Sequence, residues 1–141
     1  MVWNTKRGGV QVYNGNKIPF DDKFFDFTIS ESVIDSMTFE LAKKLIKEID
    51  RVTKKYFFVS LISSDSNTMF NQLDKDNFFV DEVVVEENHE KGTIQSFFDM
   101  QKIKEFIKDT TFKISWCEKH IVQDILNGTQ HGRYYLLLEK E

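Results

Sequence analysis

The feature that most constrains the fold is an apolar run that directly follows an amphipathic segment. Residues Tyr56–Ile62 are apolar at nearly every position, which is typical of a central parallel strand rather than of an antiparallel strand with one solvated face. The preceding segment, Met37–Val52, carries apolar side chains at helical spacing and predicts a helix capped by Asp35 or Ser36. Upstream, Phe24–Ile29 is rich in aromatic and β-branched residues and predicts a strand. Together the three segments predict a right-handed strand–helix–strand unit of the α/β class.

The second half of the chain continues this alternation. Phe78–Val85 predicts a further strand, and the apolar spacing after Asp99 predicts a second amphipathic helix. Alternating residues predict a strand over Phe112–Cys117, and helical spacing predicts a short helix over 121–126. A Tyr- and Leu-rich run near the C-terminus predicts a last buried strand. We expect one domain over residues 1–141, because the sequence contains no repeat, low-complexity tract or linker.

Composition excludes several classes of protein. The chain of 141 residues contains 14 Phe and is 40% hydrophobic, so it is not a disordered tail. Its net charge of −4 argues against a general nucleic-acid or anionic-membrane binder. One Cys allows neither an internal disulfide nor a Cys-based metal cluster. Since no segment approaches the roughly 20 apolar residues that cross a bilayer, we expect a cytoplasmic protein without membrane contact.

Three further groups of residues each have a chemical and a structural interpretation. The acidic run Glu86–Glu90 includes His89 and resembles a set of metal ligands, but no second His stands at ligand spacing. We therefore expect a solvated loop there and no metal site. His120 and Asp124 are four residues apart, as an acid–base pair or a surface contact on a helix requires. Cys117 is expected to be a packed thiol rather than a nucleophile.

Three segments, taken in order, carry a resemblance to a known family. Ile18–Phe27 is Ile-Pro-Phe-Asp-Asp-Lys-Phe-Phe-Asp-Phe, Glu48–Lys55 is Glu-Ile-Asp-Arg-Val-Thr-Lys-Lys, and Ser96–Ile114 combines a predicted helix with a predicted strand. They resemble the second half of a class I S-adenosylmethionine (SAM)-dependent methyltransferase. The first is similar to the family's LPF-acid-polar-x-FD entry to its fourth strand, and the second to its E-x-x-R-V-L-K helix end. The resemblance implies an α/β fold: a partial Rossmann-like sheet, equivalent to strands 4 to 7 of the family, flanked by helices.

The resemblance also implies a cofactor site and a reaction. The cofactor would be SAM, and its methyl group would pass to a substrate that the sequence does not identify. In the family, residues just before the LPF motif contact the adenine, and the loop after the fourth strand contacts the methionine part. The matching positions here are Asn14, Gly15 and Asn16, and Ser30, Glu31 and Ser32. Ligands of open parallel sheets bind beyond the carboxyl ends of the strands, which also favours the second group. No catalytic residue is implied.

The chain departs from the family in one respect. The acid-x-Gly-x-Gly loop that holds the cofactor there has no counterpart in residues 1–20, so we expect only the second half of the fold. The strand Phe24–Ile29 would then be an apolar sheet edge. We expect this edge to pair with a second copy, with a complementing chain, or with Val10–Tyr13. A non-catalytic module for oligomerisation or partner binding is the alternative function, and a flavodoxin-like protein is disfavoured because no phosphate-binding loop is visible.

Overall fold

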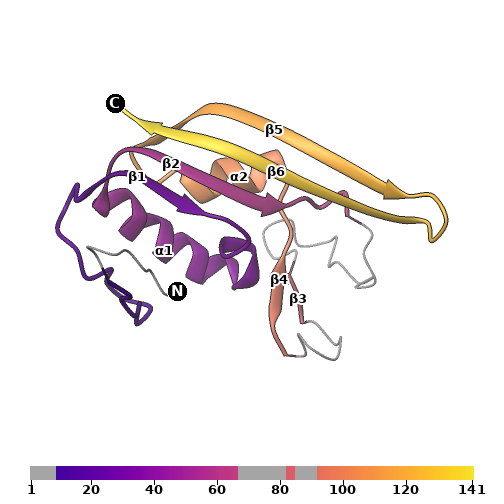
Figure 1. Ribbon diagram of the computed structural model, residues 1–141, viewed down its shortest axis with the longest axis horizontal. Coiled ribbons are helices and arrows are strands. Elements are labelled where there is room, and N and C mark those ends of the chain that lie inside the picture. Colours follow the sequence, from indigo (N-terminus) through magenta and orange to yellow (C-terminus); the bar gives the residue numbers. More distant parts are fainter. Residues whose placement is uncertain (1–8, 67–81, 85–91) are drawn as a thin grey trace.

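The computed structural model describes residues 9–66, 82–84 and 92–141 of the chain. At its centre is a four-stranded sheet with the order β1-β2-β6-β5 (Figure 1). The strands are β1 (Phe25–Ser30), β2 (Thr53–Ile62), β6 (Thr129–Lys140) and β5 (Phe112–Asp124). β1 and β2 run parallel, whereas β6 is antiparallel to both of its neighbours. The prediction of two adjacent parallel strands joined by a helix is therefore confirmed.

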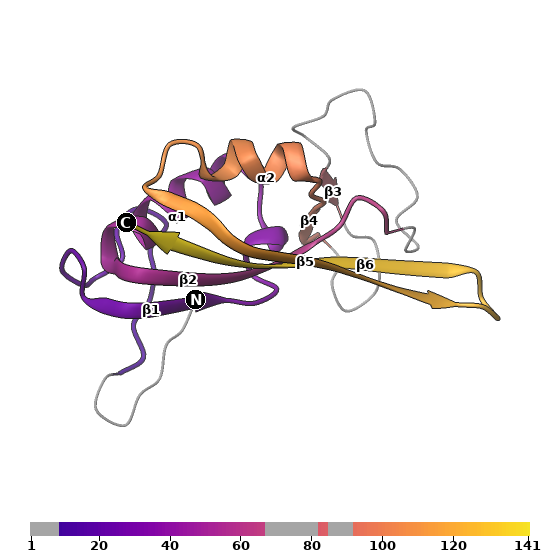
Figure 2. The same cartoon turned by 90° about the horizontal axis from the view of Figure 1, so that it is seen from above.

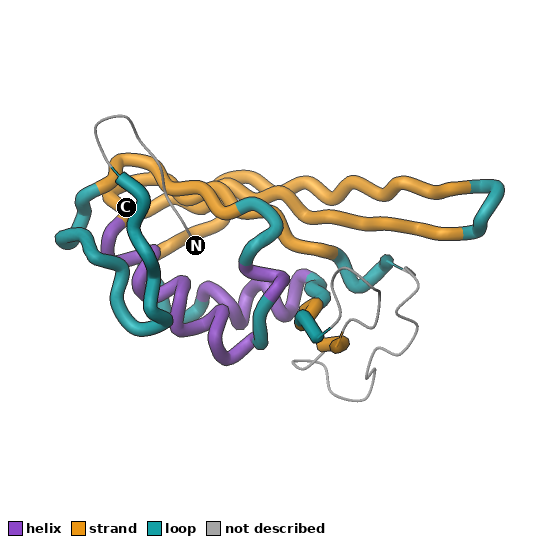
Figure 3. Tube along the Cα trace, turned by 60° about the horizontal axis from the view of Figure 1, so that its bottom comes forward, coloured by secondary structure: helices purple, strands orange, loops and turns teal. Residues whose placement is uncertain are grey.

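Both helices lie on the same face of this sheet, as Figures 2 and 3 show. They are α1 (Phe39–Val52) and α2 (Met100–Ile107), and a short 3-10 helix, η1 (Ile34–Ser36), precedes α1. A separate hairpin consists of β3 (Glu82–Val84) and β4 (Ile94–Ser96). The fold is a partial Rossmann-like α/β sheet flanked by helices, as predicted. Within the described ranges, no helix is long and apolar enough to span a membrane.

The apolar run in β2 is fully buried on one face of the sheet. Phe57, Val59 and Leu61 lie beneath the helices and are at most 1% exposed, because alternate residues of a strand point to the same face. Tyr56 and Phe58 point to the other face and are half-buried. The expectation that this run is covered on both faces is thus met only in part, since both helices pack on one side.

Helix α1 starts two residues later than predicted, and a different residue caps it. The Thr38 side chain accepts a hydrogen bond from the Leu41 amide at 3.2 Å, which satisfies one of the free N–H groups at the helix start. Asp35 and Ser36, the predicted caps, lie in η1 instead. The predicted apolar stripe is confirmed except at Leu41, which is 39% exposed, and it also takes in Phe39. Its buried members are Phe39, Ala42, Leu45, Ile46, Ile49 and Val52.

Helix α2 is capped by Asp99, as predicted, and is held to β4 by a buried lysine. The Asp99 carboxylate accepts a hydrogen bond from the Lys102 amide at 2.8 Å. The Lys102 side chain is 1% exposed, and its Nζ donates to the Ser96 hydroxyl and to the Phe97 carbonyl, each at 2.9 Å. Nζ also lies 4.7 Å from the ring centroid of Phe98, a cation–π arrangement. These contacts join the start of α2 to the end of β4.

The hairpin of β5 and β6 shows that the predicted helix over 121–126 is wrong. β5 continues through Asp124 and pairs with β6 up to Thr129. The apolar residues in this part have helix-like spacing, but the structure exposes them. Their exposed fractions are 47% for Ile121, 67% for Val122, 84% for Ile125 and 95% for Leu126. Because β2 ends at Ile62 opposite Arg133, the outer part of the hairpin projects beyond the other strands (Figure 1).

The predicted helical pairing of His120 with Asp124 is wrong for the same reason. His120 Nε2 lies 2.9 Å from the Glu118 carboxylate. Asp124 instead organises the hairpin turn, where its carboxylate accepts hydrogen bonds from the side chain and amide of Asn127 and from the amide of Leu126. These bonds, those of Asn127 first, hold the pKa of Asp124 below its ordinary value.

Two predictions fall on or beside residues outside the described ranges. Of the predicted strand Phe78–Val85, the structure describes Glu82–Val84, which forms β3. The acidic run Glu86–Glu90, with His89, lies outside the described residues.

Candidate functional site

The segment predicted to contact the methionine part of the cofactor lies at the carboxyl end of β1. Ser30 is the last residue of the strand and is 3% exposed, and its Oγ has no hydrogen-bond partner in the described part of the chain. Glu31 is exposed. Ser32 has a φ of +54°, a left-handed conformation that is uncommon for residues other than Gly. Its amide donates to the Ser60 hydroxyl of β2 at 3.2 Å, so the segment bends sharply across the end of the sheet.

A buried ion pair that the sequence patterns did not predict lies beside this segment. Asp35 is 3% exposed, and its Oδ2 accepts a hydrogen bond from the Ile62 amide at 2.7 Å and from Arg133 Nη1 at 3.0 Å. Arg133 Nη1 also lies 3.3 Å from the Ser60 hydroxyl. The pair therefore joins the loop after β1 to the end of β2 and to β6. The Arg133 side chain is 17% exposed and lies where the carboxyl ends of β1 and β2 meet.

The sequence carries a weak signal for this pair. Asp35 resembles a helix cap because it precedes an amphipathic stretch, and Arg133 follows His131 and Gly132 in a turn-like sequence. Only the antiparallel register, which places Arg133 opposite Ile62, brings the two charges together. The signal in the sequence is that Arg133 directly precedes the apolar run Tyr134–Leu138, because a charge beside a buried strand needs a partner.

The second predicted segment forms a turn stabilised by its own side chain. The Asn14 side-chain oxygen accepts hydrogen bonds from the amides of Asn16 at 3.0 Å and Lys17 at 3.3 Å, an Asx turn. Gly15 has a φ of +89°, which Gly adopts without strain. Asn14 and Asn16 are exposed. Within the described residues this turn and the segment after β1 share no hydrogen bond, so the structure does not join them directly.

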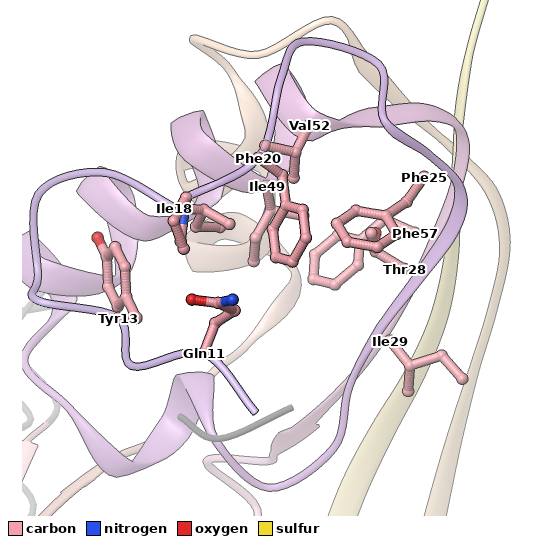
Figure 4. Close-up of a pocket in the computed structure, with 11 residues that line it drawn as sticks. Gln11, Tyr13, Ile18, Phe20, Phe25, Thr28, Ile29, Ile49, Val52 and Phe57 are labelled. Atoms are coloured by element: carbon pink, nitrogen blue, oxygen red, sulfur yellow. The ribbon is translucent and has the colours of Figure 1, made fainter. Parts of the chain in front are cut away.

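An apolar cavity lies between the parts of the chain that carry these two segments (Figure 4). Its volume is about 60 Å³, and its walls include Tyr13, Ile18, Phe25, Ile29, Ile49 and Phe57. Tyr13 immediately precedes Asn14, and Ile29 immediately precedes Ser30, so both predicted segments begin at the wall of one cavity. Pockets for cofactor-sized ligands measure roughly 300–1,000 Å³. The cavity is therefore too small to hold a whole nucleoside cofactor.

Tyr13 places a polar group at the edge of this apolar cavity. Its hydroxyl is buried without a hydrogen-bond partner among the described residues. Burial, and then the nearby Glu48 carboxylate, raise the pKa of Tyr13 above its ordinary value. The hydroxyl therefore stays protonated and is able to donate a hydrogen bond.

An ion-pair network explains the E-x-x-R spacing at the end of α1. Glu48 and Arg51 are one helical turn apart, and Arg51 Nη2 lies 2.9 Å from Glu48 Oε2. Arg51 donates to the carbonyls of Ile18 and Phe20, each at 2.8 Å, and Glu48 accepts from the Ile18 amide at 2.8 Å. The hydrogen bond from Arg51 holds the pKa of Glu48 below its ordinary value. The pair thus anchors the loop that leads into β1 (Ile18–Asp22).

Cys117 is half-buried and packs against the hydrophobic core. Burial raises the pKa of its thiol, which disfavours the nucleophilic thiolate. The prediction of a packed thiol is confirmed.

Comparison with protein families gives one match. A family model described as a methyltransferase domain matches residues 3–58, a stretch that includes β1, α1 and the first part of β2. No curated protein sequence matches the chain significantly.

Solved structures share the fold at low sequence identity. A SAM-dependent methyltransferase from Methanosarcina mazei is 20% identical, with a TM-score of 0.70 over 97% of this chain and 70% of that chain. A protein from Pyrococcus horikoshii OT3 is 17% identical, with a TM-score of 0.63 over 93% and 58%. Magnesium protoporphyrin IX methyltransferase from Synechocystis PCC 6803, solved with bound SAM, is 11% identical, with a TM-score of 0.51 over 87% and 42%. This chain thus spans 42 to 70% of the length of these structures. The solved structures show that the chain has a partial Rossmann-like fold of the kind found in class I methyltransferases, and the family match covers less than half of the chain, residues 3–58.

Proposed function

We propose that the chain binds SAM at the carboxyl end of β1 and takes part in transferring its methyl group to an acceptor. The observation that carries this proposal is the parallel pair β1–β2, extended by antiparallel β6 and β5, with Ser30, Glu31 and Ser32 at its carboxyl edge. Open α/β sheets bind their ligands at this edge. The comparisons do not favour the alternative of a non-catalytic module.

The residues at this edge suit the polar groups of SAM. The buried Ser30 hydroxyl has no partner in the described part of the chain, and such an unsatisfied group is costly unless a ligand or water pairs with it. Glu31 is an exposed carboxylate that suits an ammonium group or ribose hydroxyls. The exposed side-chain amide of Asn16 offers a donor and an acceptor for an adenine edge, and Asn14, whose oxygen accepts the bonds of the Asx turn, offers its Nδ2 as a donor. The donor set therefore fits the cofactor.

The residues of the chain act mainly by positioning. SAM, when bound, supplies a methyl group on a positively charged sulfur that is already activated for transfer. Catalysis then depends chiefly on holding the reacting groups in line, which requires no fixed base. The Asp35–Arg133 pair holds the loop after β1 against β2 and β6, and Glu48 and Arg51 hold the loop before β1. These contacts hold the loop after β1 and the loop that follows Asn14, Gly15 and Asn16.

Calorimetric titration of SAM and of S-adenosylhomocysteine into the purified chain tests this proposal. We expect a dissociation constant below about 100 μM, equivalent to roughly 5.5 kcal/mol. Replacing Glu31→Ala removes a charged hydrogen-bond acceptor and is expected to weaken binding about fivefold or more. The matched control is Glu40→Ala, an exposed carboxylate on α1, which should leave binding unchanged. Absence of binding heat, or equal effects of both variants, contradicts the proposal.

Cytoplasmic location is part of the same proposal and rests on the sequence. The single Cys and the content of charged residues (30%) suit a reducing, aqueous compartment.

A further inference from the structure

A groove lies on the face of the central sheet opposite α1 and α2, the side without these helices in Figure 2. Its volume is about 400 Å³, within the range of roughly 300–1,000 Å³ that small-molecule pockets occupy. Residues from the first half of β1, the start of β2 and the end of β6 line it. The candidate cofactor segment begins at Ser30, at the other end of β1, and contributes no residue to the groove. The groove is therefore separate from the proposed SAM site.

Two aromatic side chains form the apolar part of this groove. Phe27 of β1 and Tyr56 of β2 lie opposite each other in the parallel register. Both point away from the helices, because Thr28 and Phe57, the next residues in each strand, are buried on the helix side. Phe27 is 44% exposed and Tyr56 is half-buried. Two rings side by side at an open surface suit a flat, apolar ligand.

A bulge in β2 places two consecutive lysines beside these rings. Between the same two pairs of facing residues, β1 has one residue, Asp26, and β2 has two, Lys54 and Lys55. In a regular strand, one of two successive side chains would point toward the helices. The bulge breaks this alternation, so both lysines are exposed and both line the groove. Bulges are often found next to functional sites because they redirect side chains.

The two lysines differ in their partners. Lys54 Nζ lies 3.2 Å from the Asp26 carboxylate. Lys55 Nζ lies 4.8 Å from the ring centroid of Tyr56, and it forms no ion pair with a carboxylate in the described part of the chain. The Glu141 carboxylate beside the groove is already paired with another lysine. Lys55 thus presents a positive charge directly above an aromatic ring, without an anion to neutralise it among the described residues.

A third lysine at the groove, Lys140, is committed to other contacts. Its side chain is 11% exposed, and its Nζ donates to the carbonyls of Asp50 at 2.6 Å and Thr53 at 2.8 Å. It also pairs with the Asp50 carboxylate at 3.3 Å. The positive charge offered to a ligand therefore comes from the bulge.

We propose that this groove binds a planar aromatic molecule that carries an anionic group, either a carboxylate or a phosphate. The ring of the ligand lies against Phe27 and Tyr56, and its anion pairs with Lys55. Because the lysine stands over the tyrosine ring, a ligand whose anion is attached directly to its ring reaches both. A nucleic acid strand is disfavoured, since carboxylates border the groove and the chain has a net charge of −4. The proposal does not depend on methyl transfer.

Titrating 2-naphthoate and 1-naphthyl phosphate into the ¹⁵N-labelled chain tests this site by NMR and distinguishes the carboxylate from the phosphate. We expect at least one of them to give saturable amide shifts at Phe27, Lys55 and Tyr56, with a dissociation constant below about 1 mM. 2-Naphthol lacks the anion and inorganic phosphate lacks the ring, so each should bind about fivefold more weakly or less. Equal affinity for either control overturns the proposal. Shifts confined to Ser30–Ser32, or no saturable shift at the three groove residues, also overturn it.

Two variants separate the charge from the ring, with circular dichroism as the measure of folding. Lys55→Gln should weaken binding of the anionic ligand about fivefold or more and leave 2-naphthol unaffected, because it removes only the charge. Tyr56→Leu removes the ring and should weaken binding of both ligands.

The matched control is Lys43→Gln on α1. Lys43 Nζ lies 5.1 Å from the ring centroid of Phe39, the same kind of contact at a distance from the groove, so this variant should bind the ligand as the wild type does. Equal weakening by Lys55→Gln and Lys43→Gln overturns the proposal, because it would show an effect of net charge alone. Lys55 is an exposed residue, so this comparison holds even if Tyr56→Leu fails to fold.

Discussion

Asp35 and Arg133 stand 98 positions apart in the sequence, yet their Oδ2 and Nη1 atoms are 3.0 Å apart at the carboxyl edge of the sheet. The same Asp35 oxygen accepts the Ile62 amide at the end of β2. The buried Asp35 carboxylate thus links the loop after β1 to the end of β2 and to Arg133 of β6. The shape of the candidate cofactor edge depends on this link.

Breaking the pair from the Arg133 side should destabilise the protein strongly. Arg133→Met leaves Asp35 buried without its cation, and we expect a loss of about 3 kcal/mol in the free energy of unfolding. In the double variant Asp35→Asn with Arg133→Met no uncompensated charge remains, so its loss should be well below the sum of the single losses. Urea unfolding measures all three variants. Additivity within about 0.5 kcal/mol would show that the pair is not coupled.

The contact between Thr28 and Thr53 tests the parallel pairing of β1 with β2. Their hydroxyl oxygens are 2.8 Å apart, and both residues are buried. Thr28→Val or Thr53→Val alone leaves one buried hydroxyl without this partner and should cost about 1–2 kcal/mol. The double variant removes both hydroxyls and should cost less than the two single variants together. Thermal unfolding of the set checks this, and a double variant that loses the full sum contradicts the contact.

Gly132 lies where β6 approaches the segment after β2 closely. A Cβ added at Gly132 would lie 3.0 Å from Ser63 Cβ, so Gly132→Ala requires the Ser63 side chain to move away by a few tenths of an ångström. We expect a loss of about 1–3 kcal/mol and partial recovery when Ser63→Gly is added, because that change removes the opposing Cβ. Gly9→Ala is the control, since nothing lies within 4 Å of its added Cβ. Chemical denaturation compares the four chains, and a failure of Ser63→Gly to restore any stability would refute the steric explanation.

The stability contributed by Glu48 should depend on pH. Its pKa is lowered in the folded protein, first by the hydrogen bond from Arg51, so the folded state favours the charged carboxylate. This contribution is fully present above the ordinary pKa of 4.5 and is lost as the pH falls through the folded-state pKa. Glu48→Gln should therefore be less stable than wild type at pH 7, by roughly 1–2 kcal/mol, with the difference shrinking below about pH 4.5. Urea unfolding between pH 7 and pH 3 measures the difference, and a constant value over this range would contradict the assignment.

A matched change at a partly exposed ion pair controls for this experiment. Glu105 of α2 forms a pair with Lys108, the residue that ends the helix, and within the described residues it makes no backbone contact like those of Glu48. Exposed helix pairs contribute little, so Glu105→Gln should change stability less than Glu48→Gln does.

The sequence was sufficient to predict β1, α1 and β2 (Figure 1), where local patterns and burial agree. The continuous apolar run of β2 and the stripe of α1 record real burial, and the Glu48–Arg51 spacing records a real contact with the loop before β1. At the hairpin tip the same kind of pattern was misleading. Ile121, Val122 and Ile125 have helical spacing, but they are exposed on a projecting strand and turn, so their spacing does not reflect a buried helix face.

The candidate site was only partly predictable for a related reason. Ser30, Glu31 and Ser32 follow a recognisable strand, and a strand's carboxyl end is where a ligand is expected. Asp35 and Arg133 join this edge through long-range register, which no local pattern records. The cap of α1 could not be predicted either. Asp35, Ser36 and Thr38 are all residue types that cap helices, and the backbone conformation of the folded chain selects Thr38.

The central claim is that SAM binds beside Ser30, Glu31 and Ser32. Titrating S-adenosylhomocysteine into the ¹⁵N-labelled chain and following the amide resonances by NMR tests this claim most directly. We expect the largest saturable shifts at Ser30–Ser32, with smaller shifts at Gly15 and Asn16 and none at the hairpin turn 125–128. Saturation of the protein without any change at Ser30–Ser32, or shifts confined to other parts of the sheet, would contradict the account.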